Sequence, residues 1–161
     1  MQVVTRRSGS LNAASWHDGF LYLRFAGSRL AVSQHCGASG GDGVEDGAAW
    51  WRSLAEQSHP FFAGEEPLWR ITSKPAADQS DSDCLVDWGG ARRWFRGGQG
   101  LQERERQARK LGGEAALYRG GDRSGEVFHA RSDAQKQVHL ALKKTFDPQG
   151  VFNPGRLYSW L

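Results

Sequence analysis

The end of the chain, residues 146–161, constrains the fold more than any other stretch. Pro148 cannot continue a helix, so the helix before it must end at or before Asp147. Gly150 permits the positive φ of a tight turn, and Asn153-Pro154-Gly155 signals a second turn. Large apolar side chains lie between and after these turns, at Val151, Phe152, Leu157, Tyr158, Trp160 and Leu161. A solvated tail rarely carries so many of them, so we expect this tail to dock on a surface.

The composition argues against several classes of protein. With 161 residues, 39% of them hydrophobic and 24% charged, the sequence is typical of one globular domain rather than a disordered segment. The net charge is only +3 and the basic residues are scattered, which disfavours a nucleic-acid partner. No apolar run reaches the ~18 residues of a membrane span, and the N-terminus carries no apolar signal segment. We therefore expect no membrane span and no export.

The pattern of strands and helices predicts an α+β fold. Aromatic and β-branched runs bounded by glycine predict strands, and capped apolar stripes predict helices. Strands are expected at 19–27, 67–73, 84–96 and 114–119, with helices at 28–36, 46–58 and 101–111; residues 12–16 are ambiguous. The paired Gly89-Gly90 inside the third strand indicates a bulge or a close backbone approach. This order predicts a ferredoxin-like split βαβ domain, an antiparallel sheet with helices on one face.

A last helix is predicted before the tail. Ser132 and Gln135 have the spacing of a capping box, and the helix should bury a stripe formed by Val138, Leu142 and Phe146. The two cysteines, Cys36 and Cys84, lack metal spacing and are expected to be reduced, mostly buried thiols. Seven Trp and eight Phe can overfill a small core and leave an apolar patch. We expect self-association through such a patch at the tail, most simply as a two-fold homodimer.

Three stretches of the sequence resemble one family. The segment Phe-Asp-Pro-Gln-Gly-Val-Phe-Asn-Pro-Gly-Arg-Leu-Tyr resembles the C-terminal signature of FAD-linked oxidases of the vanillyl-alcohol-oxidase type, and more narrowly of the FAD-binding subunit of glycolate oxidase. Pro67–Ile71 and Val86–Trp94 resemble the same subunit, the latter through its Asp-Trp-Gly-Gly-Ala-Arg-Arg-Trp run; 14–19 and 23–27 fit as well. The resemblance implies the C-terminal cap-domain portion only, without the FAD-binding domain of the family. Residues 1–15 would be a linker or a remnant of that domain, 16–131 the cap domain, and 132–161 the C-terminal helix and return segment.

The resemblance also implies a chemistry. In the family the flavin accepts a hydride from the α-carbon of a 2-hydroxy acid, and the protein binds the carboxylate and takes the hydroxyl proton. Arg93 matches the Arg-Trp position of the family and is the leading carboxylate ligand, since a guanidinium can bind a carboxylate through two hydrogen bonds. Arg70 and Trp88 are further candidates for substrate contact, and Asn153 and Arg156 for contact with FAD. Each arginine could instead be a surface residue stacked on a neighbouring Trp, which is the favoured interpretation.

No residue is assigned as the general base. Histidine is the default proton acceptor, but the five histidines share no metal spacing and a structural role is favoured for each of His17, His35, His59, His129 and His139. No metal site is predicted. Asp87 could be a buried acid with a raised pKa, or it could bond an arginine of the same sheet, which we favour.

Two hypotheses of function follow. In the first, the chain is the cap part of a glycolate-oxidase-like FAD subunit and contributes to the oxidation of glycolate or a related 2-hydroxy acid to the 2-oxo acid, being inactive alone. Its partners would be a sibling FAD subunit and an iron–sulfur subunit, in the cytoplasm or held at the inner membrane by those partners. In the second, it is a non-catalytic assembly module of such a complex.

Overall fold

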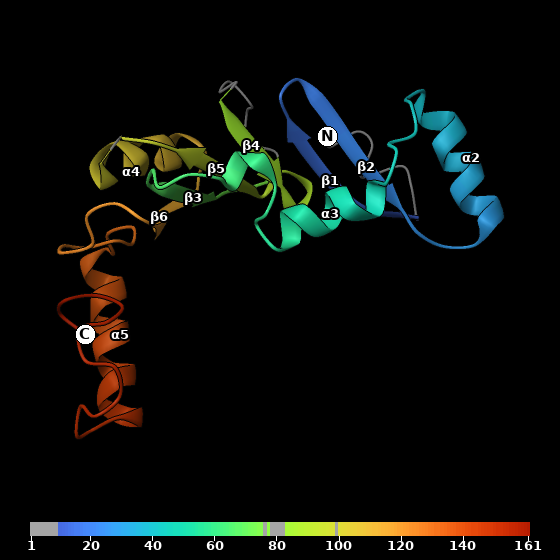
Figure 1. Ribbon diagram of the computed structural model, residues 1–161. Helices are drawn as coiled ribbons and strands as arrows, with labels where there is room; N and C mark the ends of the chain where they lie inside the picture. The colour runs from blue at the N-terminus through green and yellow to red at the C-terminus, as the bar shows by residue number, and fades with distance from the viewer. Residues whose placement is uncertain (1–9, 76, 78–82, 99) are drawn as a thin grey trace.

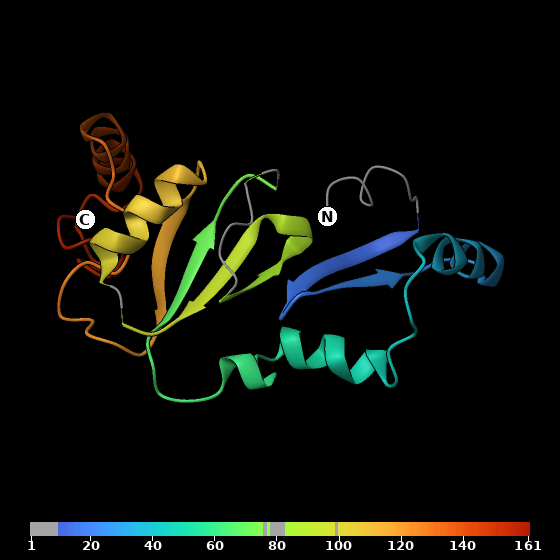
Figure 2. The same cartoon turned by 90° about the horizontal axis from the view of Figure 1, so that it is seen from above.

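The computed structural model describes residues 10–75, 77, 83–98 and 100–161. Within them six strands form one antiparallel sheet in the order β2-β1-β4-β5-β3-β6. Figures 1 and 2 show an elongated molecule in which the last helix runs away from one end of the sheet. The expected α+β fold with an antiparallel sheet is confirmed. No helix in the described ranges is long and apolar enough to cross a membrane.

The first two strands form a hairpin. β1 (Leu11–His17) pairs with β2 (Phe20–Phe25), and the two turn residues Asp18 and Gly19 have φ values of 50° and 80°. Positive φ at both positions is what a tight two-residue hairpin needs. β1 includes the ambiguous stretch 12–16 and crosses the expected boundary between residues 15 and 16.

The hairpin meets the rest of the sheet at a narrow joint. β1 pairs with β4 (Cys84–Asp87) through one residue pair, Trp16 opposite Val86. The buried hydroxyl of Ser15 adds a hydrogen bond of 2.7 Å to the carbonyl oxygen of Val86. On one side of the joint, the ring of Tyr22 stacks on Trp50 with centroids 4.0 Å apart. The hairpin is thus joined to the sheet by a very short ladder, and side-chain packing, including that of Trp16 on the main core, supplies the remaining contacts.

Two helices and a short 3-10 turn follow the hairpin. They are α2 (Arg29–Ser39), α3 (Gly47–Ala55) and η1 (Pro60–Phe62). Ser28 and Asp46 cap the helices as predicted, by accepting hydrogen bonds from backbone N–H groups of the first turn. Cys36 lies exposed on α2, contrary to the expectation for both thiols, whereas Cys84 is buried; both are free cysteines.

The expected strand 84–96 is in fact two strands. β4 and β5 (Arg92–Arg96) pair with each other in antiparallel register, with Asp87 opposite Arg92. The link between them is η2 (Trp88–Gly90), in which Trp88, Gly89 and Gly90 have φ values of 52°, 63° and 101°. Three consecutive residues of positive φ reverse the chain, so the glycine pair makes a hairpin turn and not a bulge. The bulge, one of the two alternatives for the glycine pair, and the single continuous strand were therefore wrong.

The remaining elements complete the sheet and cover one face. β3 (Leu68–Thr72) lies between β5 and β6 (Glu114–Arg119), and α4 (Leu101–Lys110) connects β5 to β6. Because side chains alternate along strands, one face carries the main core against α4, formed by Trp69, Ile71, Cys84, Val86, Phe95, Ala108, Ala115 and Leu117. The opposite face packs Phe62 of η1 on Leu68, Leu85 and Trp94. Near the hairpin this second face stays open.

The C-terminal helix does not pack as the sequence predicted. α5 (Asp133–Phe146) begins with the predicted Ser132–Gln135 capping box. The stripe expected to be buried is exposed, with 59% of Val138, 50% of Leu142 and 78% of Phe146 accessible to solvent. Figure 1 gives the reason: α5 points away from the sheet, so nothing in the described chain covers this stripe.

The tail folds back beside α5 and on the loop before it. Tyr158 is buried, and its hydroxyl accepts a hydrogen bond of 2.7 Å from Arg131 Nε and donates one of 3.1 Å to the carbonyl of His129. Asp147 accepts hydrogen bonds of 2.9 Å from the backbone of Val151 and Phe152. The tail therefore docks, as expected, but on its own helix and loop, and Val151 and Phe152 remain exposed.

Candidate functional site

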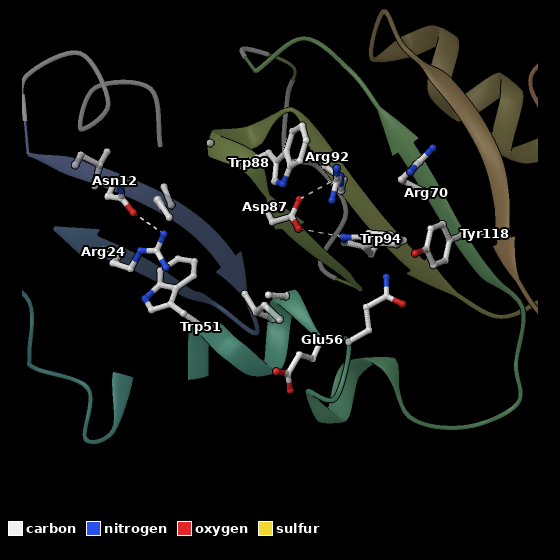
Figure 3. Close-up of a pocket in the computed structure, with 17 residues that line it drawn as sticks. Asn12, Arg24, Trp51, Glu56, Arg70, Asp87, Trp88, Arg92, Trp94 and Tyr118 are labelled. Carbon is white, nitrogen blue, oxygen red and sulfur yellow. Dashed lines mark hydrogen bonds and ion pairs between the residues drawn. The ribbon is translucent and has the colours of Figure 1, made fainter. Parts of the chain in front are cut away.

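A cleft of about 1030 Å³ opens on the face of the sheet opposite α4. One wall comes from the β1–β2 hairpin and α3, with Asn12, Arg24 and Trp51, and the other from strands β3 to β6 (Figure 3). The residues of the second wall project to the same face because they alternate with core residues along their strands; they are Arg70, Asp87, Arg92, Trp94 and Tyr118, with Trp88 and Gly89 at the turn.

A carboxylate and a guanidinium on two paired strands line the cleft beside each other. Asp87 and Arg92 face each other across the β4–β5 ladder, and Oδ1 of Asp87 lies 3.8 Å from Nε of Arg92. The other carboxylate oxygen accepts a hydrogen bond of 3.2 Å from Nε1 of Trp94 (Figure 3). Burial raises the pKa of Asp87, while the Trp94 hydrogen bond and the charge of Arg92 oppose the increase. Asp87 thus forms an ion pair with an arginine of the same sheet, the favoured interpretation, although among the described residues its Oδ1 accepts no hydrogen bond.

The arginine also stacks on an exposed aromatic ring. Cζ of Arg92 lies 3.8 Å from the centroid of the Trp88 ring and 5.6 Å from that of Trp94. The exposed fraction of Trp88 is 70%, which is high for so large an apolar side chain. Arg92 is therefore bounded by Asp87 at one edge and by Trp88 on one face.

Among the described residues, two further arginines line the cleft. Cζ of Arg70 lies 5.6 Å from the centroid of the Tyr118 ring. Arg24 donates a hydrogen bond to Oδ1 of Asn12 and lies 5.4 Å from the centroid of the Trp51 ring. Arginine on aromatic walls favours a planar anion, because the guanidinium pairs with carboxylate oxygens while the rings exclude water. The arrangement is suited to binding a small carboxylate.

The structure separates the residues that the sequence singled out for the substrate. Arg70 and Trp88 line the cleft, but Arg93 points to the opposite face, where it is buried. Its guanidinium donates to the hydroxyl of Ser73, to the carbonyl of Gly90 at 3.1 Å and to that of Ala77 at 2.9 Å. Since neighbouring residues of a strand face opposite ways, Arg92 occupies the position in the cleft that was expected for Arg93.

The two residues assigned to FAD lie elsewhere. Asn153 and Arg156 belong to the same turn of the tail, where the backbone N–H of Arg156 donates to the carbonyl of Asn153 at 3.2 Å. Both are exposed and neither lines the cleft. The described residues thus do not bring the proposed substrate and cofactor contacts together into one flavin site.

No histidine lies among the described residues that line the cleft. His59 instead caps η1, since its Nδ1 accepts a hydrogen bond of 3.2 Å from the backbone of Phe61. Burial lowers the pKa of His59, helped by the charge of His17, whose ring centroid lies 5.3 Å away. Within the described ranges, no three His, Cys, Asp or Glu side chains are grouped to hold a metal ion.

Sequence reasoning missed Arg92 and Arg24. The signal for Arg92 was present: Arg92, Trp94 and Arg96 alternate with Arg93 and Phe95, so only one of two adjacent arginines could face a given side. Reading Gly89-Gly90 as a hairpin turn would also have placed Arg92 opposite Asp87. Arg24 had no comparable signal, because its place depends on the packing of α3 beside β2.

Comparison with known proteins adds independent evidence. Glycolate oxidase subunit GlcE of Escherichia coli (strain K12) is 35% identical to this chain over 153 residues, which cover 94% of this chain and 42% of GlcE. The chain is homologous to part of GlcE. The resemblance inferred from the sequence is thereby confirmed, and the chain spans less than half the length of this relative. With 94% of the chain covered, the similarity to GlcE takes in most of the sheet and the cleft. No family model matches the chain. No solved structure matches it either.

Proposed function

We propose that this chain is the cap portion of a glycolate-oxidase-like FAD subunit. In that role it contributes to the oxidation of glycolate, or a related 2-hydroxy acid, to the 2-oxo acid. The observation that carries the proposal is the arginine-lined cleft on the open face of the sheet, in a chain homologous to part of GlcE. A concave site with a few converging polar groups is the usual form of a small-molecule site.

The tasks of this chain in such a reaction are binding and exclusion of water. The flavin of the complete enzyme would supply the acceptor for the hydride. Arg92 and Arg70 would bind the carboxylate of the acid, and Trp88 would cover it. Asn153 and Arg156 stay candidates for contact with the cofactor; they lie in the C-terminal tail and are not among the residues that line the cleft. The proton acceptor is not assigned.

The proposal is tested by reconstitution. The chain is co-expressed with the part of GlcE that it does not match, and the purified product is examined for flavin absorbance and for its bleaching by glycolate under anaerobic conditions. We expect bound flavin that glycolate reduces, and loss of reduction in Arg92→Gln with flavin retained. Flavin that is bound but stays oxidised with glycolate, lactate and other 2-hydroxy acids would refute the proposal.

The partners of the complete enzyme are part of the same proposal. A sibling FAD subunit and an iron–sulfur subunit would receive the electrons, and the assembly would lie in the cytoplasm or at the inner membrane through those partners. Co-purification of the three subunits with tagged chain, followed by cell fractionation, tests both statements.

The exposed stripe of α5 favours a second candidate function, that of a non-catalytic assembly module. Val138, Leu142 and Phe146 on the helix, with Val151 and Phe152 on the tail, form an apolar arm that stands clear of the sheet. Leaving several such side chains in water is costly, at ~1.5–3 kcal/mol each. We propose that this apolar arm forms a contact between subunits, a homodimer being the simplest. Light scattering across a concentration series tests it, and a strict monomer would count against the module.

A further inference from the structure

Trp88 adopts a conformation that its own packing does not explain. Its φ of 52° lies in the left-handed region, which large side chains rarely enter. Glycine follows it twice, so a glycine at position 88 would make the same turn with less strain. The ring gains little burial in return, because 70% of the residue is exposed. Strain that burial does not offset is found most often at functional positions.

The contact that the strained turn creates is the one with Arg92. The ring lies over one face of the guanidinium, with Cζ 3.8 Å from the centroid, which restricts how the guanidinium can rotate. Asp87 lies beside the Nε edge at 3.8 Å and is itself fixed by the Trp94 indole at 3.2 Å. One edge and one face of the guanidinium are therefore occupied by protein.

The terminal nitrogens of Arg92 remain available. In the part of the chain that the structure describes, neither Nη1 nor Nη2 of Arg92 donates a hydrogen bond, and 21% of the side chain is exposed, in the cleft. These two nitrogens are the donors that match the two oxygens of a carboxylate. A buried arginine with a structural task instead spends its donors on the protein, as Arg93 does on the opposite face.

We propose that Asp87, Trp88 and Arg92 form a binding site for one carboxylate group, which we call the receiver. Arg92 contacts the ligand through Nη1 and Nη2, and Asp87 and Trp88 are positioning residues that hold its edge and its face. The ligand class, the carboxylate end of a 2-hydroxy acid, rests on the proposed function. The receiver itself rests on the geometry of the β4–β5 hairpin, so it can be tested without any flavin chemistry.

The test uses the 161-residue chain with glycolate as the ligand. Glycolate is titrated at constant ionic strength while the indole N–H signals of the tryptophans are followed by heteronuclear NMR. We expect saturable shifts of the Trp88 and Trp94 signals, absent with methyl glycolate and with sodium chloride. Arg92→Lys should weaken binding at least about tenfold, because a lysine cannot make the paired contact. Arg106→Gln, the matched control on the exposed side of α4 and outside the cleft, should change the affinity by less than about twofold, as for a surface charge.

The variant Trp88→Gly tests whether Trp88 positions Arg92 for the ligand or only contributes to the stability of the fold. This variant should unfold at a higher denaturant concentration than the parent, because glycine adopts the positive φ without strain. It should nevertheless bind glycolate at least about fivefold more weakly, since Arg92 loses the ring that restricts it. A residue with only a structural role could not raise stability and lower affinity together.

Two results would overturn the receiver. They are equal glycolate shifts in Arg92→Lys and in the parent, or a Trp88→Gly variant that binds as tightly as the parent. Failure of the proposed function gives a different pattern, in which glycolate binds at Arg92 but the reconstituted flavin is not reduced.

Discussion

Replacing Arg93 by methionine distinguishes a structural arginine from a substrate ligand. Arg93 is the residue that the family resemblance favoured for binding the carboxylate, yet it is only 2% exposed and lies against the α4 face. Its guanidinium donates to the Ser73 hydroxyl and to the carbonyls of Gly90 and Ala77, at 3.1 and 2.9 Å. Gly90 belongs to the same turn as Trp88, so Arg93 stabilises this turn of the cleft from the opposite face of the sheet.

The expected loss of stability can be worked out from these three acceptors. In Arg93→Met the Ser73 hydroxyl keeps the hydrogen bond of 3.4 Å that it already donates to the Lys74 carbonyl. The carbonyls of Gly90 and Ala77 lose a donor, and each unsatisfied buried acceptor costs ~1–3 kcal/mol. The sum is roughly 2–6 kcal/mol, offset in part because a buried charge is removed. A domain of this size has about 5–15 kcal/mol of stability, so the loss should be large.

Urea unfolding followed by tryptophan fluorescence measures this difference. Arg96→Met, on the opposite face of the same strand and with only an exposed ion pair to Glu66, is the matched control and should change the free energy of unfolding by less than about 1 kcal/mol. The reasoning is refuted if Arg93→Met unfolds within about 1 kcal/mol of the parent. It is also refuted if that variant stays folded and loses glycolate binding, because Arg93 would then be a ligand after all.

Four further outcomes are expected. Leu142→Glu should shift the association seen by light scattering to higher concentration, and an unchanged profile would place the contact elsewhere. Asp87→Ala should lower the free energy of unfolding by about 1–3 kcal/mol in urea titrations, because the Trp94 indole loses its acceptor and Arg92 loses its ion-pair partner; a change within about 0.5 kcal/mol would contradict this. The hydrogen bond from Lys143 holds the pKa of Asp147 below 3.8, so its stabilisation of the tail is present above that pH and is lost as the pH falls through the lowered pKa; Trp160 fluorescence should report this, and Asp147→Asn should flatten the profile. The purified 161-residue chain should be colourless, and a flavin spectrum near stoichiometric occupancy would contradict that expectation.

Local signals predicted the helices well. Ser28, Asp46 and the Ser132–Gln135 capping box mark the start of α2, α3 and α5, because a cap acts on backbone groups only three residues away. The β4–β5 hairpin was missed for the opposite reason. Paired glycines permit a bulge or a reversal, and only the pairing of the flanking strands decides between them.

The candidate site shows the same division. The family motif located the correct hairpin but pointed to Arg93, whereas Arg92 is the residue that faces the cleft. The two arginines are adjacent, and which of them faces the cleft depends on which face of the sheet α4 covers. The stripe of α5 was predicted to be buried and is exposed. Periodicity shows only which residues share one side of a helix. What covers such a stripe is a property of tertiary contacts, and the periodicity of one helix holds no information about them.

The narrow joint between β1 and β4 has a mechanical consequence. The two walls of the cleft are joined by one ladder pair, Trp16 with Val86, by the hydrogen bond of the Ser15 hydroxyl, and by the packing of Trp16 and Leu54 on the two core clusters. This ladder is shorter than those between the other neighbouring strands, so we expect the spacing of the walls to vary more than the spacing of β3, β5 and β6. Amide hydrogens of β2 should exchange through local opening, long before those of β3 and β5. An anion that contacts Arg24 and Arg92 together would hold the two walls at one spacing and slow that exchange.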